Sequence, residues 1–478
     1  MKIILHGFGA FPFVHYHMIQ KAKSLFPFLE WSIVLGNSIP LQLFREKLPE
    51  VPLLDVEDAW TEKLASVSNA NEIDLSSYNG NIYSDIAAEK RNFKHRSGEE
   101  QLRRAASLYF VVKNFFMKIQ PDYAMISQIE GVDGKIFAAV ARELGVRLIV
   151  PCSCRNLGGI FFAEADAEIV PSYAEVNAAS LSEAEKFLHQ FRKSPTPANS
   201  PIHFPGEPLP DFQKPFLSRA WQGIKRGLRH PELLEPDTFR IALLNNLPVL
   251  RDSIWGVRAR INRLSTHIEF QADLPESFVY YPLQYSPESS INTPAPYFVD
   301  QLRVLDAIRF SLPGNIRLVV KEHPACLGLR PVPFYRQLKK LPGVVIASVN
   351  MKSSLLIQHA LLTISVTGTS ILEAFLFGKS AIALGSNLIA HALGGITTLS
   401  SLPLTIQQRL GQEIPDETII KGLAEIFSVR HCCNFSSPGT VGEPILRDEN
   451  IERLLHALHQ HIEKTSKNGS REAHEFVC

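Results

Sequence analysis

Short apolar segments alternate with amphipathic stretches over residues 1–165, and this alternation constrains the fold more than any other feature of the sequence. Strands are expected at 2–6, 31–35, 123–127 and 146–151, with helices at 15–25, 98–118 and 134–144. Strands and helices that alternate at this spacing form βαβ units and a parallel sheet. Residues 37–98 have a weaker pattern and receive no assignment.

The same alternation returns after residue 271. Strands are expected at 278–282, 316–321, 344–347, 362–366 and 380–384, with helices at 298–310 and 371–377. Two doubly wound α/β domains that face each other across a cleft are the simplest architecture for such a chain. Ligands of these sheets gather at the carboxyl ends of the strands.

The region between the two blocks differs in composition. A helix is expected at 181–192, with Ser180 and Glu183 in capping-box spacing. Seven prolines between Pro195 and Pro215 then predict a linker, and a helix with a basic side follows at 216–229. This helix either rests on an anionic membrane surface or packs on its own protein with a solvated basic side. A final helix is expected at 450–463, before a disordered tail at 464–478.

Composition excludes several classes of protein. The 478 residues are 45% hydrophobic, and 49 Lys plus Arg nearly balance 48 Asp plus Glu, which excludes a disordered chain and argues against nucleic-acid binding. No apolar run is long enough to cross a bilayer, and no signal peptide is predicted, so we expect a cytoplasmic protein. Six cysteines form neither a disulfide framework nor a zinc motif, and no metal site is indicated.

A hydroxyl-rich turn at 365–370 is the strongest local motif. A buried strand leads into Ser365, Thr367, Gly368, Thr369 and Ser370, and a helix starts immediately afterwards. Backbone N–H groups and hydroxyls at such a turn can hold a phosphate. Glu373, one turn into the helix, can accept hydrogen bonds from a ribose. The alternative is that Ser370 and Glu373 form a capping box that needs no ligand.

Two further strands of the same block end in polar residues. The strand at 316–321 ends at Lys321, and His323 and Pro324 follow it. The side chains of Lys321 and His323 can bind a phosphate. The strand at 278–282 runs into a loop that contains Gln284 and Glu288. These two residues either contact a base or a sugar, or belong to a solvated turn.

In the N-terminal block, Gln128, Glu130 and Gly131 follow a strand and precede a helix. Glu130 can act as a general base on an acceptor hydroxyl or as a nucleophile at an anomeric carbon. Asp133 is the competing carboxylate, with a helix N-cap as its structural explanation. Gly7 and Gly9 lack the third glycine of a dinucleotide-binding motif. Arg155 is a candidate for binding an anion.

In combination, these motifs resemble the bacterial capsule-polysaccharide synthesis family, which includes Kdo transferases. The resemblance is clearest over residues 278–385, in PLQYSPE, KEHP and SVTGTSILEA, and is essentially absent over 167–270. It implies a GT-B-like fold with two Rossmann-like domains, the donor nucleotide on the C-terminal domain and no catalytic metal. The expected divisions are an acceptor-side domain at 1–165, a linker and basic insertion at 166–270, a donor domain at 271–430, and a helix with a tail at 431–478.

The motifs also resemble those of CMP-sugar enzymes, including polysialyltransferases. The resemblance implies that His323 and Pro324 form a His-Pro motif and that Ser365 to Ser370 hold the CMP phosphate. Glu130 and Gly131 would supply the catalytic carboxylate, although Ile129 stands where that pattern has a second acidic residue. Glu373 matches the glutamate that many GT-B enzymes use on the donor ribose.

We therefore expect a metal-independent glycosyltransferase that moves a sugar, best represented by CMP-linked Kdo, to a capsule, other surface glycan or glycolipid. It would need no cofactor beyond the nucleotide sugar and would not bind nucleic acid. Contact with the inner face of the inner membrane is an open alternative to a purely cytoplasmic location. The rival functions are a nucleotide-sugar epimerase or hydrolase on the same fold, and a non-catalytic capsule-assembly scaffold.

Overall fold

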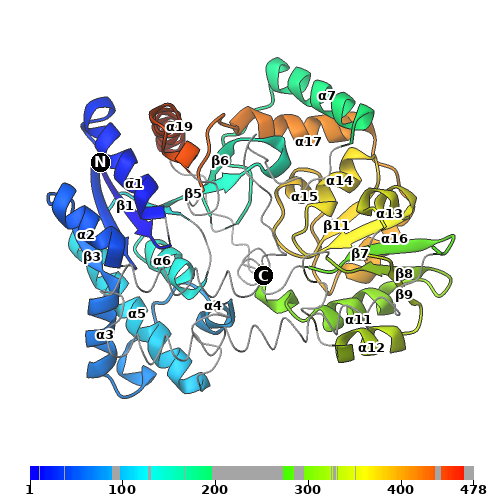
Figure 1. Cartoon of the computed structure of the whole chain (residues 1–478), viewed down its shortest axis with the longest axis horizontal. Coiled ribbons are helices and arrows are strands. Elements are labelled where there is room, and N and C mark those ends of the chain that lie inside the picture. The colour runs from blue at the N-terminus through cyan, green and yellow to red at the C-terminus, as the bar shows by residue number, and fades with distance from the viewer. Residues whose placement is uncertain are drawn as a thin grey trace, which may run out of the picture.

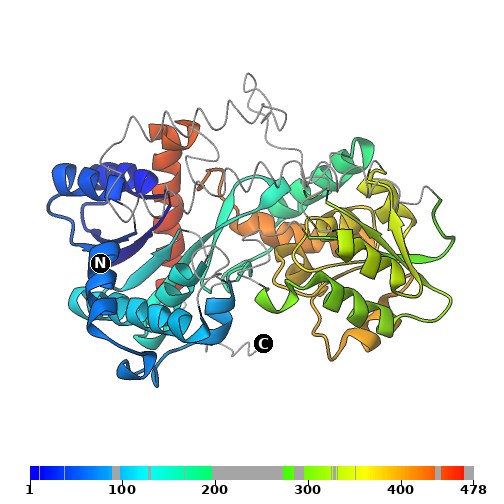
Figure 2. The same ribbon diagram turned by 60° about the horizontal axis from the view of Figure 1, so that its bottom comes forward.

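A computed structural model describes most of the chain: residues 1–9, 11–36, 38–88, 97–127, 131–165, 167–195, 273–284, 295–323, 326, 330, 332–349, 351–436 and 443–467. Figure 1 and Figure 2 show two α/β regions side by side, one blue and cyan, the other green to orange. The predicted basic helix at 216–229 and the prolines beyond Pro195 lie outside the described residues.

The N-terminal region is built on a sheet of strand order β3-β2-β1-β4-β5-β6. All neighbouring strands are parallel except β5 and β6. Ile3, Ile4 and Leu5 of β1 are completely buried, as expected for a central strand covered on both faces. The strands are β1 (Lys2–Gly7), β2 (Glu30–Leu35), β3 (Leu53–Asp55), β4 (Tyr123–Ile126), β5 (Arg147–Ser153) and β6 (Ile160–Ala163).

The predicted helices around this sheet are present, and three more lie in the stretch without an assignment. Side-chain caps explain where several begin: Asp55 caps α3 and Ser97 caps α5. The helices are α1 (Phe11–Leu25), α2 (Ser38–Lys47), α3 (Val56–Ser66), α4 (Ile82–Ala88), α5 (Gly98–Ile119), α6 (Gly131–Glu143) and α7 (Ala178–Lys193). The predicted cap of α7 is wrong: Asn177 is the N-cap, and Ser180 completes that capping box from inside the helix.

The C-terminal region is built on a parallel sheet of order β11-β10-β7-β8-β9. Its strands confirm the predictions: β7 (Phe278–Pro282), β8 (Arg317–Lys321), β9 (Val344–Ala347), β10 (Leu362–Ser365) and β11 (Ala381–Ala383). Its helices are α11 (Gln301–Ser311), α12 (Val332–Lys340), α13 (Ser353–His359), α14 (Ser370–Leu376), α15 (Leu388–Ala392), α16 (Leu402–Arg409) and α17 (Asp416–Val429).

The two sheets share one topology. In each, the first strand lies between the second and the fourth, so the direction of winding reverses beside it. This reversal is the topological switch point, where doubly wound sheets bind ligands. The N-terminal switch point lies between β1 and β4, and the C-terminal one between β7 and β10. The expected GT-B-like fold of two Rossmann-like domains is confirmed.

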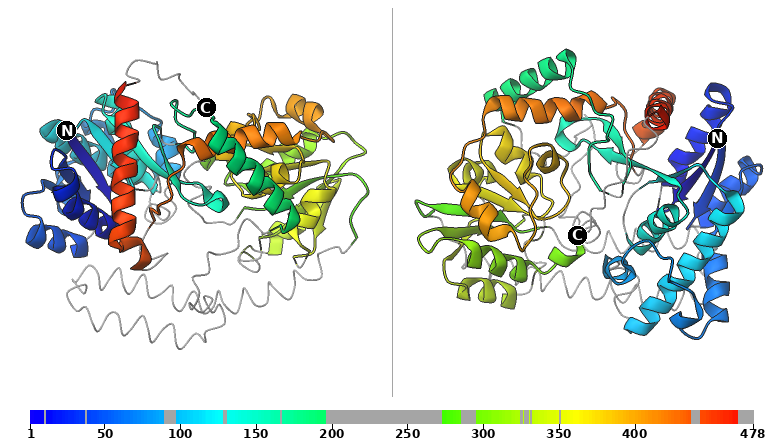
Figure 3. Two further views of the ribbon diagram at one scale, coloured as in Figure 1. Left: turned by 90° about the horizontal axis from the view of Figure 1, so that it is seen from above. Right: turned by 180° about the vertical axis from the view of Figure 1, so that it is seen from behind.

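Two helices connect the regions in opposite directions. Helix α7 packs along α17, and Arg192 forms two hydrogen bonds of 2.6 Å with Asp416. Helix α19 (Asp448–Lys467) returns to the N-terminal region and packs against α1, as Figure 3 shows from above. The predicted tail is wrong for residues 464–467, which continue α19 because Thr465 is buried and bonds back to His461. Residues 468–478 lie outside the described residues.

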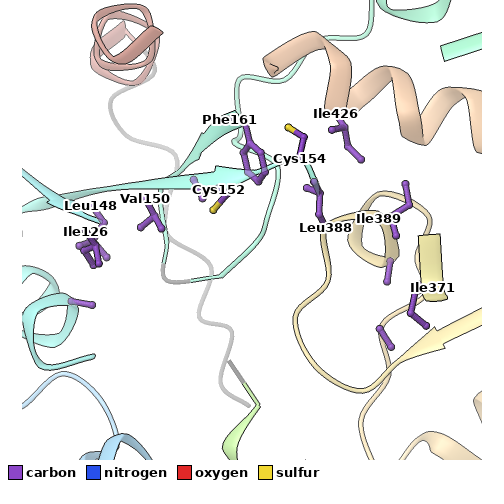
Figure 4. Packing of buried hydrophobic residues seen from close by; sticks show 14 of the residues in the cluster. Ile126, Leu148, Val150, Cys152, Cys154, Phe161, Ile371, Leu388, Ile389 and Ile426 are labelled. Carbon is purple, nitrogen blue, oxygen red and sulfur yellow. The ribbon is translucent and has the colours of Figure 1, made fainter. Parts of the chain in front are cut away.

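The hydrophobic core also runs from one sheet to the other. Figure 4 shows it continuing from Ile126 and Leu148 of the N-terminal sheet, past Phe161, to Leu388 and Ile371 of the C-terminal region. The strand pair β5 and β6 therefore connects the two regions through packed side chains. The exact domain divisions remain a prediction.

Candidate functional site

The polar candidates of the C-terminal region converge at its switch point. Gln284 follows β7, and the hydroxyl-rich turn follows β10, the strand beside it. The Gln284 amide donates a buried hydrogen bond of 2.9 Å from Nε2 to Ser365 Oγ. Ser365 Oγ also accepts from the Gly368 backbone N–H at 3.2 Å. One serine hydroxyl thus holds together the loops that follow the two strands.

Gly368 leaves room for a cluster of polar atoms. A Cβ added at this glycine would lie 2.6 Å from Ser365 Oγ, and 3.4 Å from both Gln284 Nε2 and Ser370 Oγ. Ser370 Oγ is buried, and no hydrogen-bond partner for it exists among the described residues. A buried hydroxyl without a partner is uncommon in proteins and indicates a position where a ligand atom can bind.

The capping-box alternative for this turn is wrong. Helix α14 begins at Ser370 itself, so its N-cap is Thr369, and no side chain caps the helix. The Asn387 amide donates to the carbonyl oxygens of Thr367 and Gly368, at 3.4 and 3.5 Å. Asn387 therefore holds the backbone of the turn, which leaves the hydroxyl of Ser370 available for a ligand.

The carboxyl end of β8 adds positive charge and an imidazole. Lys321 is buried, and its Nζ donates to Ser353 Oγ at 3.1 Å. Burial lowers the pKa of the Lys321 ammonium, while the carboxylates of Glu373 and Glu322 oppose this shift. Burial also lowers the pKa of the half-buried His323, again against the effect of Glu322. An incoming phosphate would favour the charged forms of both groups.

Glu322, which lies within the KEHP motif but had no predicted role, organises this end of β8. Its fully buried carboxylate accepts from Arg330 Nε at 2.8 Å, from the Tyr335 hydroxyl at 2.7 Å and from the His323 backbone N–H at 2.7 Å. Arg330 donates in addition to the Gln284 carbonyl oxygen. The position of Glu322 between Lys321 and His323 was the only sequence signal for this role.

Arg155 reaches across to the C-terminal region. It follows β5, and its guanidinium donates to the Thr367 carbonyl oxygen at 3.4 Å and to both carboxylate oxygens of Glu168 at 2.7 and 2.8 Å. The Glu168 backbone N–H in turn donates to Ser386 Oγ at 3.1 Å. The loops at the carboxyl ends of the two sheets therefore touch beside the hydroxyl-rich turn. A role for Arg155 in binding an anion remains a prediction.

At the N-terminal switch point, the structure brings Asp133 to a histidine that no sequence motif singled out. Asp133 lies within α6 and is not its N-cap, and its Oδ2 is 3.1 Å from His6 Nε2. Gly7 ends strand β1, and Gly9 lies in the turn that follows it. Four other candidates lie outside the described residues: Gln128, Glu130, Glu288 and Pro324.

One cavity in the described part of the chain lies apart from these residues. A cavity of about 530 Å³ opens at the amino ends of β1 and β2, between Lys2, Trp31 and Lys118. That is the edge opposite the switch points, so we assign it no role. No group of three His, Cys, Asp or Glu side chains within the described ranges is arranged to hold a metal ion. No described helix is long and apolar enough to cross a membrane.

Residues 257–425 match the model of a family described as capsule polysaccharide biosynthesis protein. This part of the chain is similar to the capsule polysaccharide biosynthesis family. The capsule-biosynthesis segment contains the C-terminal switch point with Gln284, Lys321, His323 and the hydroxyl-rich turn. The resemblance drawn from the motifs is thereby confirmed.

A curated relative of the chain is protein FixF of Sinorhizobium fredii, which is 26% identical over 196 residues. That match covers 37% of this chain and 46% of FixF, so it spans less than half of the relative.

Two solved structures illustrate how distant the structural relatives are. KpsC of Thermosulfurimonas dismutans, described as a β-Kdo 2,7 transferase, is 12% identical, with a TM-score of 0.35 and coverage of 88% of this chain and 90% of KpsC. The UDP-GlcNAc 2-epimerase of Methanocaldococcus jannaschii is 14% identical, with a TM-score of 0.22 and coverage of 96% and 100%.

Proposed function

We propose that the protein is a glycosyltransferase of capsule assembly. It moves a sugar, best represented by a CMP-linked 2-keto sugar such as Kdo, from a nucleotide donor to a capsule glycan, another surface glycan or a glycolipid. The observation that carries the proposal is the cluster of Gln284, Ser365 and the buried Ser370 hydroxyl around Gly368, at the switch point of the capsule-biosynthesis segment. Lys321 ends the neighbouring strand β8.

The proposed donor site lies in the C-terminal region. The Ser370 hydroxyl and the hydroxyl-rich turn bind the phosphate, Lys321 and His323 balance its charge, and Glu373 accepts from the ribose. When the bond between the sugar and the phosphate breaks, negative charge grows on the departing nucleotide. Cationic groups placed at that phosphate stabilise the transition state more than the bound donor, and this difference accelerates transfer.

The proposed reaction also needs a group that activates the acceptor hydroxyl. Two carboxylates follow β4 and are suited to this role. One is Glu130, which the resemblance to CMP-sugar enzymes favours, and the other is Asp133, which is held by His6. Each belongs to the N-terminal region, so donor and acceptor groups come from different sheets. The proposal uses no metal ion and no cofactor besides the nucleotide sugar.

Calorimetric titration with CMP, CDP, UDP, GDP and ADP tests the donor assignment. We expect the protein to prefer CMP and the His323→Ala variant to bind it more weakly. Gly314→Ala is the matched control, because a Cβ at Gly314 meets nothing within 4 Å. A preference for UDP would keep the reaction and change the donor. Absence of binding to any nucleotide would contradict the proposal and favour the scaffold alternative.

Incubation of the donor without an acceptor separates transfer from the epimerase alternative. An epimerase converts the sugar of its donor and needs no second substrate, whereas a transferase leaves the configuration of unreacted donor unchanged. Appearance of an epimerised nucleotide sugar would therefore contradict the proposed transfer.

A glycolipid acceptor would require contact with a membrane surface. The sequence from 214 to 263, with ten Lys or Arg against four Asp or Glu, is the part of the chain suited to that contact. We expect co-sedimentation with anionic liposomes that the double change Arg219→Glu and Lys225→Glu abolishes. Equal sedimentation of the two proteins would remove the membrane proposal.

A further inference from the structure

His6 and Asp133 form a hydrogen-bonded pair at the N-terminal switch point. His6 is the penultimate residue of β1, and Asp133 lies in the first turn of α6, the helix that follows β4. His6 Nε2 and Asp133 Oδ2 are 3.1 Å apart. The histidine side chain is 3% exposed and the carboxylate 21% exposed, so the carboxylate is the end of the pair that a substrate can reach.

The surroundings of His6 fix the orientation of its ring. The imidazole stacks on Phe8 with ring centroids 4.5 Å apart, and its edge meets Phe137 at 5.2 Å. Gly9 has a φ of 61°, a conformation that glycine adopts without strain, and it lets the chain turn from Phe8 into α1. The ring is therefore held between two aromatic side chains and directs Nε2 at Asp133.

The hydrogen bonds of the ring determine its tautomer. Nδ1 of His6 is buried and has no hydrogen-bond partner among the described residues. A proton on Nδ1 would be a buried, unsatisfied donor, which costs more than a buried lone pair. The proton of the neutral ring therefore lies on Nε2 and is donated to Asp133 Oδ2. No described residue bonds to the other carboxylate oxygen of Asp133, Oδ1.

A second buried histidine, His15, is connected to His6 through Ser127. The Ser127 hydroxyl donates to the His6 carbonyl oxygen and contacts His15 Nε2 at 3.0 Å. Burial and the nearby His6 lower the pKa of His15 to about 3, so His15 is neutral at physiological pH. The neutral His15 ring therefore adds no positive charge next to His6 and Asp133. Asp133 is the more exposed member of the pair.

We propose that Asp133 is the catalytic base that takes the proton of the acceptor hydroxyl, and that His6 is the positioning residue that orients it. This inference rests on the proposed glycosyl transfer and chooses between its two carboxylates, Asp133 and Glu130. The acceptor oxygen loses its proton to Asp133 and forms a bond with the anomeric carbon. The bond from that carbon to the phosphate breaks, and the nucleotide leaves with the electron pair.

The first experiment compares Asp133→Asn with Glu130→Gln. Purified proteins receive CMP-Kdo as donor, with water and the methyl glycosides of Kdo, glucose and N-acetylglucosamine as acceptors, and release of CMP is followed. We expect Asp133→Asn to lower kcat about 100-fold or more, the typical contribution of a general base, while the Kd for CMP is unchanged. Formate should restore part of the activity of Asp133→Ala, because it replaces the missing base.

The second experiment tests the positioning role of His6. Glutamine at this position keeps an N–H near the place of Nε2, whereas phenylalanine keeps only the stacking on Phe8. We expect His6→Gln to retain more of kcat than His6→Phe, with equal Kd values for CMP. A purely packing role for His6 predicts the opposite order.

Three results would overturn the inference. They are a kcat of Asp133→Asn within a few-fold of wild type, a loss of kcat in Glu130→Gln alone, and His6→Gln as impaired as His6→Phe. The nitrogen-15 NMR spectrum of His6 tests the inference without turnover. A neutral ring with its proton on Nδ1 would contradict the inference. If wild type binds no nucleotide, the proposed function itself fails, and that outcome is distinct from transfer that survives Asp133→Asn.

Discussion

The two sheets have the same strand order, but their switch points carry different chemistry. Between β7 and β10, an amide and hydroxyls meet at Gln284, Ser365 and Ser370, and Lys321 adds a buried ammonium at the end of the neighbouring strand β8. Between β1 and β4, an imidazole meets a carboxylate. The C-terminal groups are suited to binding an anion, and the N-terminal pair is suited to accepting a proton. The same backbone topology thus supports two different kinds of chemistry, and side chains decide which kind each sheet provides.

The two switch points also differ in how deeply their charges are buried. Beside the C-terminal one, after β8, Glu322 is fully buried with Arg330, whereas at the N-terminal one Asp133 is partly exposed beside His6. A buried charge that loses its partner is strongly destabilising, and a partly exposed one is less so. The difference implies that the C-terminal groups contribute more to the stability of the fold.

The largest expected effect is on stability, in Glu322→Gln. The change leaves the Arg330 guanidinium, whose side chain is 10% exposed, without its carboxylate, so the free energy of unfolding should fall by about 3 to 5 kcal/mol. Urea denaturation measures it. Glu449→Gln is the control, since that carboxylate and its partner Arg453 are 77% and 59% exposed and should change stability little. If Glu322→Gln lowers the free energy of unfolding no more than Asp133→Asn does, the proposed difference in burial between the two switch points is contradicted.

A smaller effect is expected from Gly368→Ala, which fills the space between the hydroxyls. The added Cβ would lie 2.6 Å from Ser365 Oγ and displace the hydrogen bond from Gln284. We expect the Kd for the preferred nucleotide to rise about tenfold, the loss of roughly one hydrogen bond. Calorimetry compares this variant with Gly314→Ala. Equal affinities of the two variants would show that the cluster around Gly368 does not contact the nucleotide.

The smallest expected effect is on the pH dependence of nucleotide affinity, and it concerns His323. Burial lowers the pKa of His323, so the free protein carries it neutral at pH 7, and a bound phosphate raises that pKa. Nucleotide binding should therefore take up a proton, and affinity should rise a few-fold as the pH falls from about 7.5 to about 6.

The comparison with His323→Gln isolates this contribution. The second ionisation of the phosphate, near pH 6, acts on both proteins alike, so the difference between them reports His323. Lys321, Glu322 and Arg330 also face this imidazole and are unchanged in the variant. The same pH dependence in both proteins would contradict protonation of His323 by the bound nucleotide.

Local pattern predicted most of the secondary structure. Strands such as β1 and β8 are short apolar runs between polar turns, and periodicity placed α5 within a residue or two of its observed ends. Helices α2 to α4 had no prediction, because their apolar positions are few and their sequence is polar. The capping predictions failed at α7, where Asn177 caps the helix three residues before Ser180, and at α14, where no side chain caps the helix.

The candidate site was predictable in part. Residues that directly follow strands, such as Gln284 and Ser365, meet because the carboxyl ends of parallel strands share one edge. Glu322 and His6 were missed because their importance depends on partners that the local sequence does not identify. Burial also mattered: a charged residue beside a turn is usually solvated, yet the Glu322 carboxylate is buried.

The sequence by itself determined the two α/β blocks, the position of the hydroxyl-rich turn and the likeness of residues 257–425 to the capsule polysaccharide biosynthesis family, because periodicity and short motifs are local properties of a chain. Only the tertiary structure decided which groups meet. It joined His6 to Asp133, 127 positions apart, and Arg155 to the carbonyl of Thr367, 212 positions apart. Such contacts depend on how strands are ordered and helices pack, and these are set by burial of apolar surface over the whole chain.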